Sequence, residues 1–272
     1  MAKKSIFINE AGYAVTTTTD TELNTGSTNP VQNQAVATVI DQILAVIAVA
    51  PTYTAPSVSI TNVTQTVEMG TTLSNFAVNI SFTQNDAGVA ESYELCRNGT
   101  QYSTDQNNTV TDTGITSSIS YVGKVTHACG VTKDNNLGIP DPTGKILAGT
   151  AASAARTITP RLKQFWGNTT AVPASSTDVR GLSNNNYETT NSFTLTTGTV
   201  NKIFAVAIPN TKAITSVIDT GNLNLNITSE YALVSGSFTV KDNGDNDRTY
   251  KLYAMQADTP YPTSTSHVIT VS

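Results

Sequence analysis

The sequence has few charged residues and almost no histidine. Only 13% of its 272 residues are Asp, Glu, Lys or Arg, and the net charge is −5. A nucleic-acid-binding surface needs clustered Lys and Arg, so this composition argues against nucleic acid as a partner. With only two histidines in the chain, an arrangement of nucleophile and histidine base is not expected either.

Cysteine is equally scarce. Cys96 and Cys129 are the only two, too few to define a disulfide framework. The sequence leaves open whether they pair, although free buried thiols are expected in a protein assembled in a cytosol. His127 lies two residues before Cys129, but further ligands at compatible spacing are missing. We therefore predict no metal site and no cofactor.

Long apolar runs are also missing where a membrane span would need them. In the one strongly helical stretch the unbroken apolar run covers only residues 43–50, too short to cross ~30 Å of hydrocarbon. Residues 1–10 contain Lys3 and Lys4 but no apolar run of the length found in signal peptides. We expect no membrane insertion and no export by the ordinary secretory route.

Motifs of known catalysts are not found. There is no Gly-x-Ser-x-Gly elbow and no His-Glu-x-x-His helix. Residues 138–145 resemble a phosphate loop only superficially, because two prolines remove N–H donors and Ile146 stands where Ser or Thr should bind magnesium. In the acidic loop 242–247 the spacing does not fit an EF-hand, so a solvated loop is favoured and ion binding stays open. We predict a protein without enzymatic activity.

The clearest positive signal is a helix over residues 29–50. Pro30 suits the first helical position, Asn29 is a good cap, and Gln32 stands where a capping-box partner reaches back. About 20 helical residues with this much apolar surface would not be stable alone in water. The helix therefore needs a partner.

Within this helix the apolar residues repeat every seven positions, as in a coiled coil. Ile at both the a and d positions favours three or four strands, and a polar a-position residue fixes the register at a cost in stability. We predict a homotrimer, and the alternative is a helix packed on its own chain. The predicted interface consists of Asn33, Val36, Ile40, Ile43, Ile47 and Ala50.

Residues 51–272 read as β-structure. Short strand-like segments, among them residues 146–148 and 202–208, are separated by turn signals, most clearly Asn98-Gly99, which suits a two-residue hairpin turn. The predicted fold is mainly β: a short N-terminal trimeric coiled-coil helix followed by two antiparallel β-sandwich domains, the first immunoglobulin-like. The predicted boundaries are 1–28 for an anchor arm and linker, 29–50 for the stalk helix, and 51–160 and 161–272 for the two sandwiches.

The first residues form a second candidate contact region. An apolar patch on a short arm cannot bury itself, so we expect it to bind another protein, with a self-tucked terminus as the alternative. Residues 16–28 are polar and are interpreted as a linker or an extended arm. The predicted anchor residues are Lys3, Lys4, Ile6, Phe7, Ile8 and Tyr13.

Residues 20–36, DTELNTGSTNPVQNQAV, resemble the L-S-x-x-S-x-N-P-V-Q-N-K-x-V segment of fibre and other structural proteins of tailed bacteriophages that infect Bacteroidales (the crAss-like type). Gln34 replaces the usual Lys. Residues 203–209, 217–219, 226–228 and 250–261 are similar to a β-domain of the same proteins.

The resemblance implies a virion protein assembled in the host cytoplasm, most like a trimeric head fibre. Its N-terminus would bind the capsid or another virion protein, and its β-domains are expected to adhere to host surface glycans. A tail fibre or collar appendage that binds a receptor is the alternative. A glycan depolymerase and a bacterial surface adhesin are less favoured, since the sequence shows neither a catalytic constellation nor an export signal.

Overall fold

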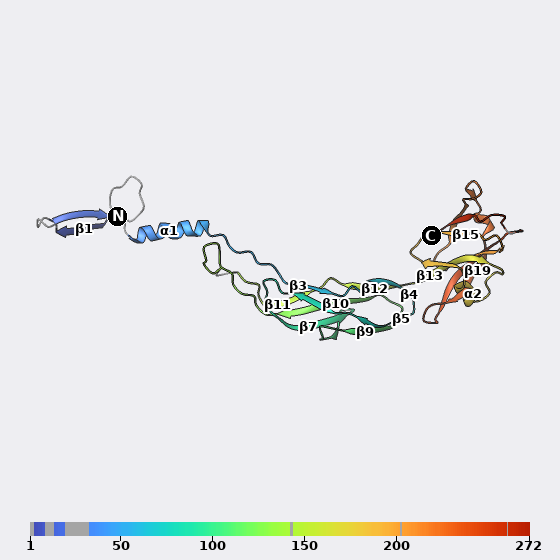
Figure 1. Ribbon diagram of the computed structural model, residues 1–272, viewed down its shortest axis with the longest axis horizontal. Helices are drawn as coiled ribbons and strands as arrows, with labels where there is room; N and C mark the ends of the chain where they lie inside the picture. The colour runs from blue at the N-terminus through green and yellow to red at the C-terminus, as the bar shows by residue number, and fades with distance from the viewer. Residues whose placement is uncertain (1–2, 9–13, 20–32, 142–143, 202, 260) are drawn as a thin grey trace. The chain divides into compact units, whose positions relative to one another are not determined.

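A computed structural model describes residues 3–8, 14–19, 33–141, 144–201, 203–259 and 261–272 (Figure 1). The fold is mainly β, with several antiparallel sheets, as predicted. The chain divides into two compact units. The first contains residues 1–56, 84–89 and 127–149, and the second contains residues 57–83, 90–126 and 150–272.

The first unit begins with an antiparallel hairpin. Strand β1 (Lys3–Ile8) pairs with β2 (Ala14–Thr19), with Lys3 opposite Thr19 and Ile8 opposite Ala14. The interpretation of residues 16–28 as a linker or extended arm did not include this pairing: four successive threonines, residues 16–19, pair with β1 because β-branched side chains suit a pleated strand. The rest of the predicted linker, residues 20–28, lies outside the described residues.

The predicted helix is present as α1 (Asn33–Ile47), and its predicted start at residues 29–32 lies outside the described residues. At its end, the side chain of Asn136 accepts a hydrogen bond from the Val49 backbone N–H (2.7 Å) and donates one to the Ile47 carbonyl (3.1 Å). A longer helix would have paired the Val49 N–H internally, but it could not have paired the Ile47 carbonyl, because Pro51 four residues later has no N–H. Ala50 therefore lies beyond the helix, and the predicted end at that residue was wrong.

Two loops of the first unit hold the segment that follows α1. Lys133 donates from Nζ to the Thr52 carbonyl (2.9 Å) and pairs with the Asp86 carboxylate (2.7 Å). Its backbone N–H donates to the Tyr53 hydroxyl (3.0 Å), and Asp86 also accepts from the Thr54 N–H (2.7 Å). The segment is thus fixed by side chains from both loops.

The first β-domain lies in the second unit and consists of β3 to β12. Its largest sheet has the order β4-β12-β10-β7-β8 with β11 also on β10, while β3 pairs with β6 and β5 with β9. The strands are β3 (Ser57–Ile60), β4 (Gln65–Glu68), β5 (Thr71–Ala77), β6 (Ile80–Thr83), β7 (Ala90–Arg97), β8 (Thr100–Ser103), β9 (Thr109–Ile115), β10 (Ile119–His127), β11 (Gly149–Ala152) and β12 (Arg156–Arg161).

Strand β10 shows how the sequence builds this domain. Its residues alternate between fully and partly buried, so Tyr121 and Val125 enter the core while Lys124 faces outward. The predicted turn at Asn98-Gly99 joins β7 to β8, and both residues have positive φ (51° and 81°), as such a turn requires. The structure thus has a β-sandwich-like arrangement, with one core cluster enclosed by strands.

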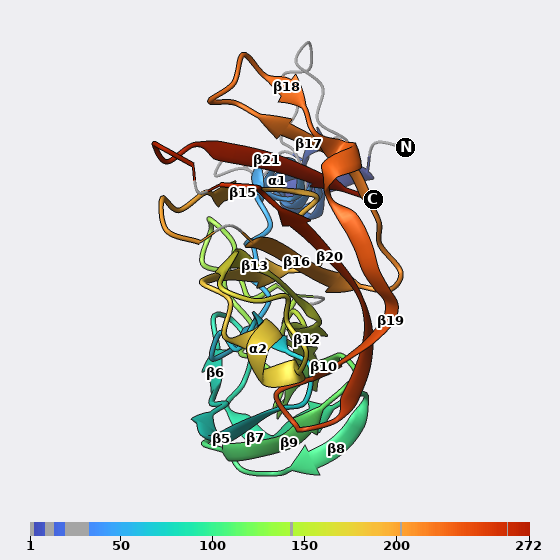
Figure 2. The same ribbon diagram turned by 90° about the vertical axis from the view of Figure 1, so that its right-hand side faces the viewer.

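The second β-domain consists of β13 to β21 with a short helix, α2. A five-stranded sheet has the order β14-β13-β16-β20-β19, of which Figure 2 labels β13, β16, β20 and β19, and a four-stranded sheet has the order β15-β21-β17-β18. The elements are β13 (Lys163–Thr169), α2 (Ser176–Arg180), β14 (Asn184–Tyr187), β15 (Ser192–Thr196), β16 (Ile203–Pro209), β17 (Ile214–Asp219), β18 (Leu225–Asn226), a 3-10 turn (Thr228–Glu230), β19 (Ala232–Lys241), β20 (Asp247–Gln256) and β21 (Ser266–Val271).

Strand β16 is buried along its whole length because the five-stranded sheet is covered on both faces. Phe204 belongs to the core cluster shared with the four-stranded sheet, whereas Ala205 belongs to a second cluster that includes Val179 of α2. A continuous apolar run, rather than an alternating one, is typical of such a central strand.

Three side chains on one face of β13 join it to the segment around β15. Gln164, Trp166 and Asn168 each donate a hydrogen bond to a backbone carbonyl there, at Thr190 (2.8 Å), Thr194 (2.7 Å) and Thr196 (2.9 Å) respectively. Because these donors stand two residues apart, they share one face of the strand. They connect β13 of the five-stranded sheet to the segment around β15, an edge strand of the four-stranded sheet, where no backbone ladder does so among the described strands.

Candidate functional site

The first candidate site is the apolar stripe of α1. Its a and d positions are partly exposed, with Ile40 at 49% and Ile43 at 53%, and the flanking Val46 reaches 85%. Val36 and Ile47 are exposed as well. These four residues of the predicted interface are therefore exposed to solvent in the single chain. Of the other two predicted residues, Asn33 is the first residue of the helix, and its side chain is not among those described. Ala50 lies beyond the end of the helix.

The predicted anchor residues fall on one strand, with one exception. Lys3, Lys4, Ile6, Phe7 and Ile8 all belong to β1. Tyr13 lies outside the described residues. Sequence reasoning did not find the partner strand β2, which fixes the extended conformation of β1.

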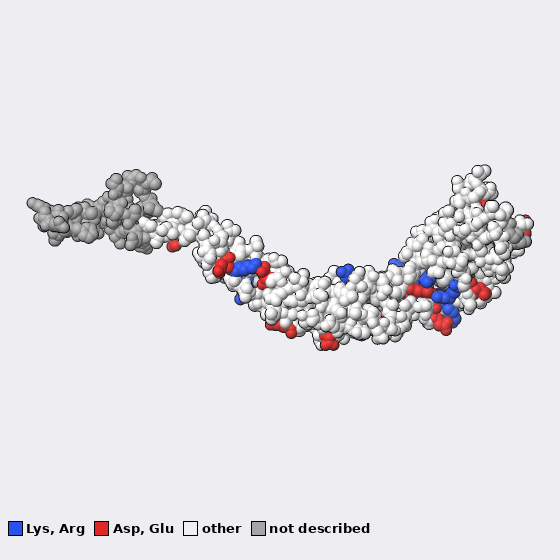
Figure 3. Space-filling model, in the orientation of Figure 1, with Lys and Arg blue, Asp and Glu red and all other residues white. Residues whose placement is uncertain are grey.

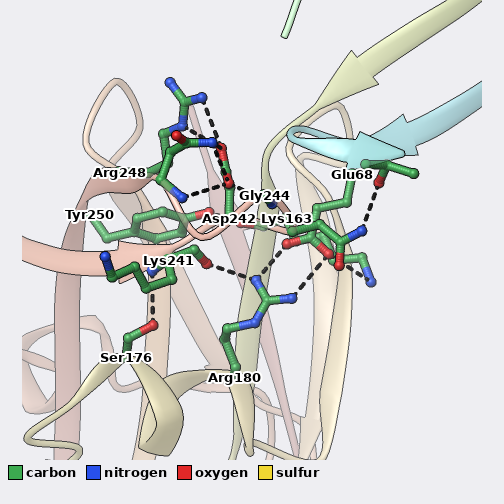
Figure 4. A network of polar contacts seen from close by, with 12 residues as sticks. Glu68, Lys163, Ser176, Arg180, Lys241, Asp242, Gly244, Arg248 and Tyr250 are labelled. Carbon is green, nitrogen blue, oxygen red and sulfur yellow. Dashed lines mark hydrogen bonds and ion pairs between the residues drawn. The ribbon is translucent and has the colours of Figure 1, made fainter. Parts of the chain in front are cut away.

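A second candidate site is the joint between the two β-domains, drawn in Figure 4. Arg180 of α2 pairs with Glu68 of β4 through both nitrogens, Nη1 to Oε1 at 2.5 Å and Nη2 to Oε2 at 3.2 Å. The same Nη1 donates to the Lys241 carbonyl (2.8 Å), and Lys163 lies 3.5 Å from Glu68. The bond with Glu68 raises the pKa of Arg180, so the guanidinium stays charged.

The chain positions Arg180 through a short helix that sequence reasoning missed. Ser175 accepts a hydrogen bond from the Asp178 N–H, and the Asp178 carboxylate accepts from the Ser175 N–H, which together form a capping box. Hydrogen bonds from the Ala174 N–H and from Ser175 lower the pKa of Asp178. Ser-x-x-Asp at residues 175–178 was the available signal.

The loop after β19 forms the other half of the joint. Asn243 donates from its backbone N–H to the Met69 carbonyl (3.0 Å) and from its side chain to Thr71 (3.0 Å). Gly70 and Gly244 lie so close that a Cβ on Gly70 would be 2.4 Å from the Gly244 nitrogen. Two glycines therefore permit a backbone approach that other residues would block.

The acidic loop 242–247 is organised by one buried carboxylate. Asp242 accepts bonds from the N–H groups of Gly244 (2.8 Å) and Asn246 (3.0 Å) and pairs with Arg248 (2.8 Å). Burial alone would raise the pKa of Asp242, but these hydrogen bonds outweigh it and hold the pKa below its ordinary value. Asp247 (2.8 Å) and Asp245 (4.0 Å) instead pair with the ammonium of Lys241, so each carboxylate of the loop has a cationic side chain as its partner.

A third candidate site is a groove of about 560 Å³ on the outward face of the first β-domain. Glu94 of β7 accepts bonds at Oε1 from the Lys124 ammonium (3.0 Å) and the Cys96 thiol (2.9 Å). The bond from Cys96 and then the bond from Lys124 lower the pKa of Glu94, which keeps the carboxylate ionised. The groove was not predicted, because residues on adjacent strands come together only through the fold.

The cysteines and histidines considered from the sequence form neither a disulfide nor a metal site in the described part of the chain. Among the described residues Cys96 is a buried free thiol and Cys129 an exposed one, and no group of His, Cys, Asp and Glu could hold a metal ion. In Figure 3, the larger groups of Lys and Arg on the visible face are mixed with Asp and Glu, and smaller basic spots stand apart, so no continuous basic stripe is seen on that face. No helix in the described ranges is long and apolar enough to cross a membrane.

Comparison with known proteins gives no match: no family model, no curated protein and no solved structure is similar to this chain.

Proposed function

We propose that the chain is a non-enzymatic structural protein of a phage virion, a homotrimeric head fibre held by its N-terminus that displays its two β-domains. The observation that carries the proposal is the exposed a and d stripe of α1. The resemblance of residues 20–36 to a phage fibre segment supplies the class of protein.

The energetics of the stripe favour self-association. Full burial of a Val or Ile side chain stabilises by about 1.5–3 kcal/mol. Ile40, Ile43 and Ile47 are each about half exposed in the single chain, so closing a bundle adds roughly 1 kcal/mol for each of these side chains in every copy. An identical helix presents the same seven-residue spacing and can therefore bury the whole stripe at once.

The oligomeric state tests the trimer directly. Light scattering or native mass measurement of the full chain is expected to give three times the mass of one chain. Ile43→Asp, which places a charge in the seam, is expected to give monomers. Gln42→Asp is the matched control, because it adds the same charge one position away from the seam, and it should stay trimeric. A wild-type monomer at micromolar concentration contradicts the proposal.

The attachment site requires a separate experiment. Removal of residues 1–19 is expected to abolish binding to the virion while the mass stays trimeric, because β1 and β2 contain the predicted anchor and α1 is untouched. Immunogold labelling of the particle should place the chain on the capsid shell. Gold label at the tail would favour the tail-fibre alternative over the head fibre. A truncated trimer that still binds the capsid would show that residues 1–19 are not the anchor.

A further inference from the structure

The outward face of the largest sheet in the first β-domain is hollowed where β7, β8, β10 and β11 meet. The groove of about 560 Å³ falls within the ~300–1,000 Å³ common for ligand sites. A register shift between Leu95 and Cys96 interrupts the pairing of β7 with β8 at this edge. Such irregularities bend a strand and often accompany binding sites.

The lining residues are chemically mixed, and, besides the aromatic Tyr93, all of them carry charged or hydrogen-bonding side chains. Ser92, Thr126 and Thr150 offer hydroxyls and Gln101 offers an amide, around the ion pair of Glu94 and Lys124. Hydroxyl and amide groups both donate and accept, whereas the carboxylate only accepts and the ammonium only donates. A matching ligand must therefore present donors and acceptors at closely spaced positions.

The charges of the groove select against a charged ligand. Lys124 offsets Glu94 at 3.0 Å, and Glu91 leaves one negative charge in excess. A polyanion would meet like charge, and a cation would find Glu94 already paired with an ammonium. A neutral polar ligand meets neither obstacle.

We propose that this groove binds a neutral oligosaccharide, an inference that rests on the proposed display of the β-domains and deepens it. Adjacent sugar hydroxyls can donate to the Glu94 carboxylate while accepting from Lys124. Glu94 uses Oε1 for both of its bonds within the described chain, so Oε2 is left to accept from the ligand.

The binding groups stand on paired strands rather than on a loop. The hydroxyls of Thr126 and Thr150 lie 3.4 Å apart on neighbouring strands, and the bonds of Glu94 fix the orientation of its side chain. Little ordering is therefore needed when a ligand enters. Three copies in a trimer would strengthen weak single-site binding through effective concentration.

The test uses the full-length wild-type protein on an array of neutral glucans, mannans and galactans together with sialylated, sulfated and uronic-acid glycans. We expect binding to at least one neutral class and none to the acidic glycans. Thr150→Trp, which fills the groove from an exposed position, should abolish binding. Glu94→Gln should raise the half-saturation concentration about tenfold, since a hydrogen bond to a charged group contributes ~1.5–3 kcal/mol.

Matched controls separate binding from folding. Thr194→Trp makes the same change at an exposed threonine of β15, and Asp247→Asn neutralises an exposed carboxylate in another ion pair. Both should bind as the wild type does, and all variants should melt within 2 °C of it by circular dichroism.

Three results would each overturn the proposal that the groove binds a neutral oligosaccharide. They are the absence of binding to any neutral glycan at 100 µM protein, binding to acidic glycans alone, and undiminished binding by Thr150→Trp. The mass of the same samples keeps the two proposals apart. A trimer that binds no neutral glycan rejects the groove alone, whereas a monomer that binds through the groove rejects the fibre alone.

Discussion

Arg180 and Glu68 stand 112 residues apart in the sequence and form a two-point ion pair across the joint of the two β-domains. The Glu68 side chain is only 10% exposed and that of Arg180 is 30% exposed. The pair is therefore partly removed from water, and each charge depends on the other for compensation.

Arg180→Met should lower the free energy of unfolding by about 2 kcal/mol, because it leaves the buried Glu68 carboxylate with Lys163 as its remaining cation. Urea unfolding followed by fluorescence measures the change. Asp247→Asn, which removes a partner of an exposed ion pair, should shift the value by less than about 0.5 kcal/mol. The double variant Arg180→Met, Glu68→Gln should lose less unfolding free energy than the sum of the losses in the two single variants. Equal losses for Arg180→Met and Asp247→Asn would show that the ion pair at the joint contributes no more stability than an exposed one.

Gly70→Ala should destabilise more than Gly99→Ala. Both glycines have positive φ (83° and 81°), so alanine strains the backbone equally, by about 1–2 kcal/mol. Only at Gly70 does the new Cβ meet other atoms, at 2.4 Å from the Gly244 nitrogen, whereas nothing lies within 4 Å of it at Gly99. The difference between the two unfolding free energies measures the close approach at the joint, and identical values would mean that the two backbones separate freely.

His267 should make the second β-domain less stable in mild acid. It is fully buried, with Nδ1 2.8 Å from the Tyr231 hydroxyl and Nε2 3.4 Å from that of Tyr261. Burial lowers the pKa of His267, and the nearby Asp219 opposes this only partly. The folded state therefore holds the neutral ring, while the unfolded chain takes up a proton near pH 6.5.

The stability contributed by neutral His267 should be complete above about pH 6.5 and decline as the pH falls toward the lowered folded pKa, by at most about 1.4 kcal/mol per pH unit. Urea unfolding at pH 7.5, 6.5 and 5.5 checks this decline. His267→Gln, which cannot titrate, should lose less stability over the same interval. If both proteins respond equally to acid, the dependence arises elsewhere.

Asn33→Ile should raise the melting temperature of the oligomer and broaden its mass distribution. A buried Asn at an a position costs stability but fixes register and strand number, so an apolar replacement exchanges specificity for stability. Differential scanning calorimetry and native mass spectrometry measure the two effects. Thr38→Ile, at a position outside the predicted seam, should change neither. A single mass with an unchanged melting temperature for Asn33→Ile would place Asn33 outside the interface.

The sequence predicted those elements whose pattern alone determines them. The helix, the Asn98-Gly99 turn and the apolar strand β16 each follow from local rules that hold in any fold. Strands such as β14, with the sequence NNNY, were missed because they have little β-propensity and form through pairing with β13. Residues 146–148 were wrongly predicted as a strand, since β11 begins only at Gly149.

The joint and the groove were invisible for a different reason. Glu68 and Arg180, like Glu94 and Lys124, are ordinary polar residues in sequence, and only the strand order places them in contact. The exposed stripe of α1 was accessible because a helix has its own period, so one element is enough to show which residues share a face.

The complete enclosure of β16 also constrains how the chain is made. Its neighbour β13 is synthesised before it, but its other neighbour β20 leaves the ribosome only after about 40 further residues. Until then IFAVAIP has one open edge, and an apolar, uncharged strand with a free edge pairs readily with copies of itself. The segment that is best protected in the finished protein is thus the one most exposed to aggregation while the protein is being synthesised.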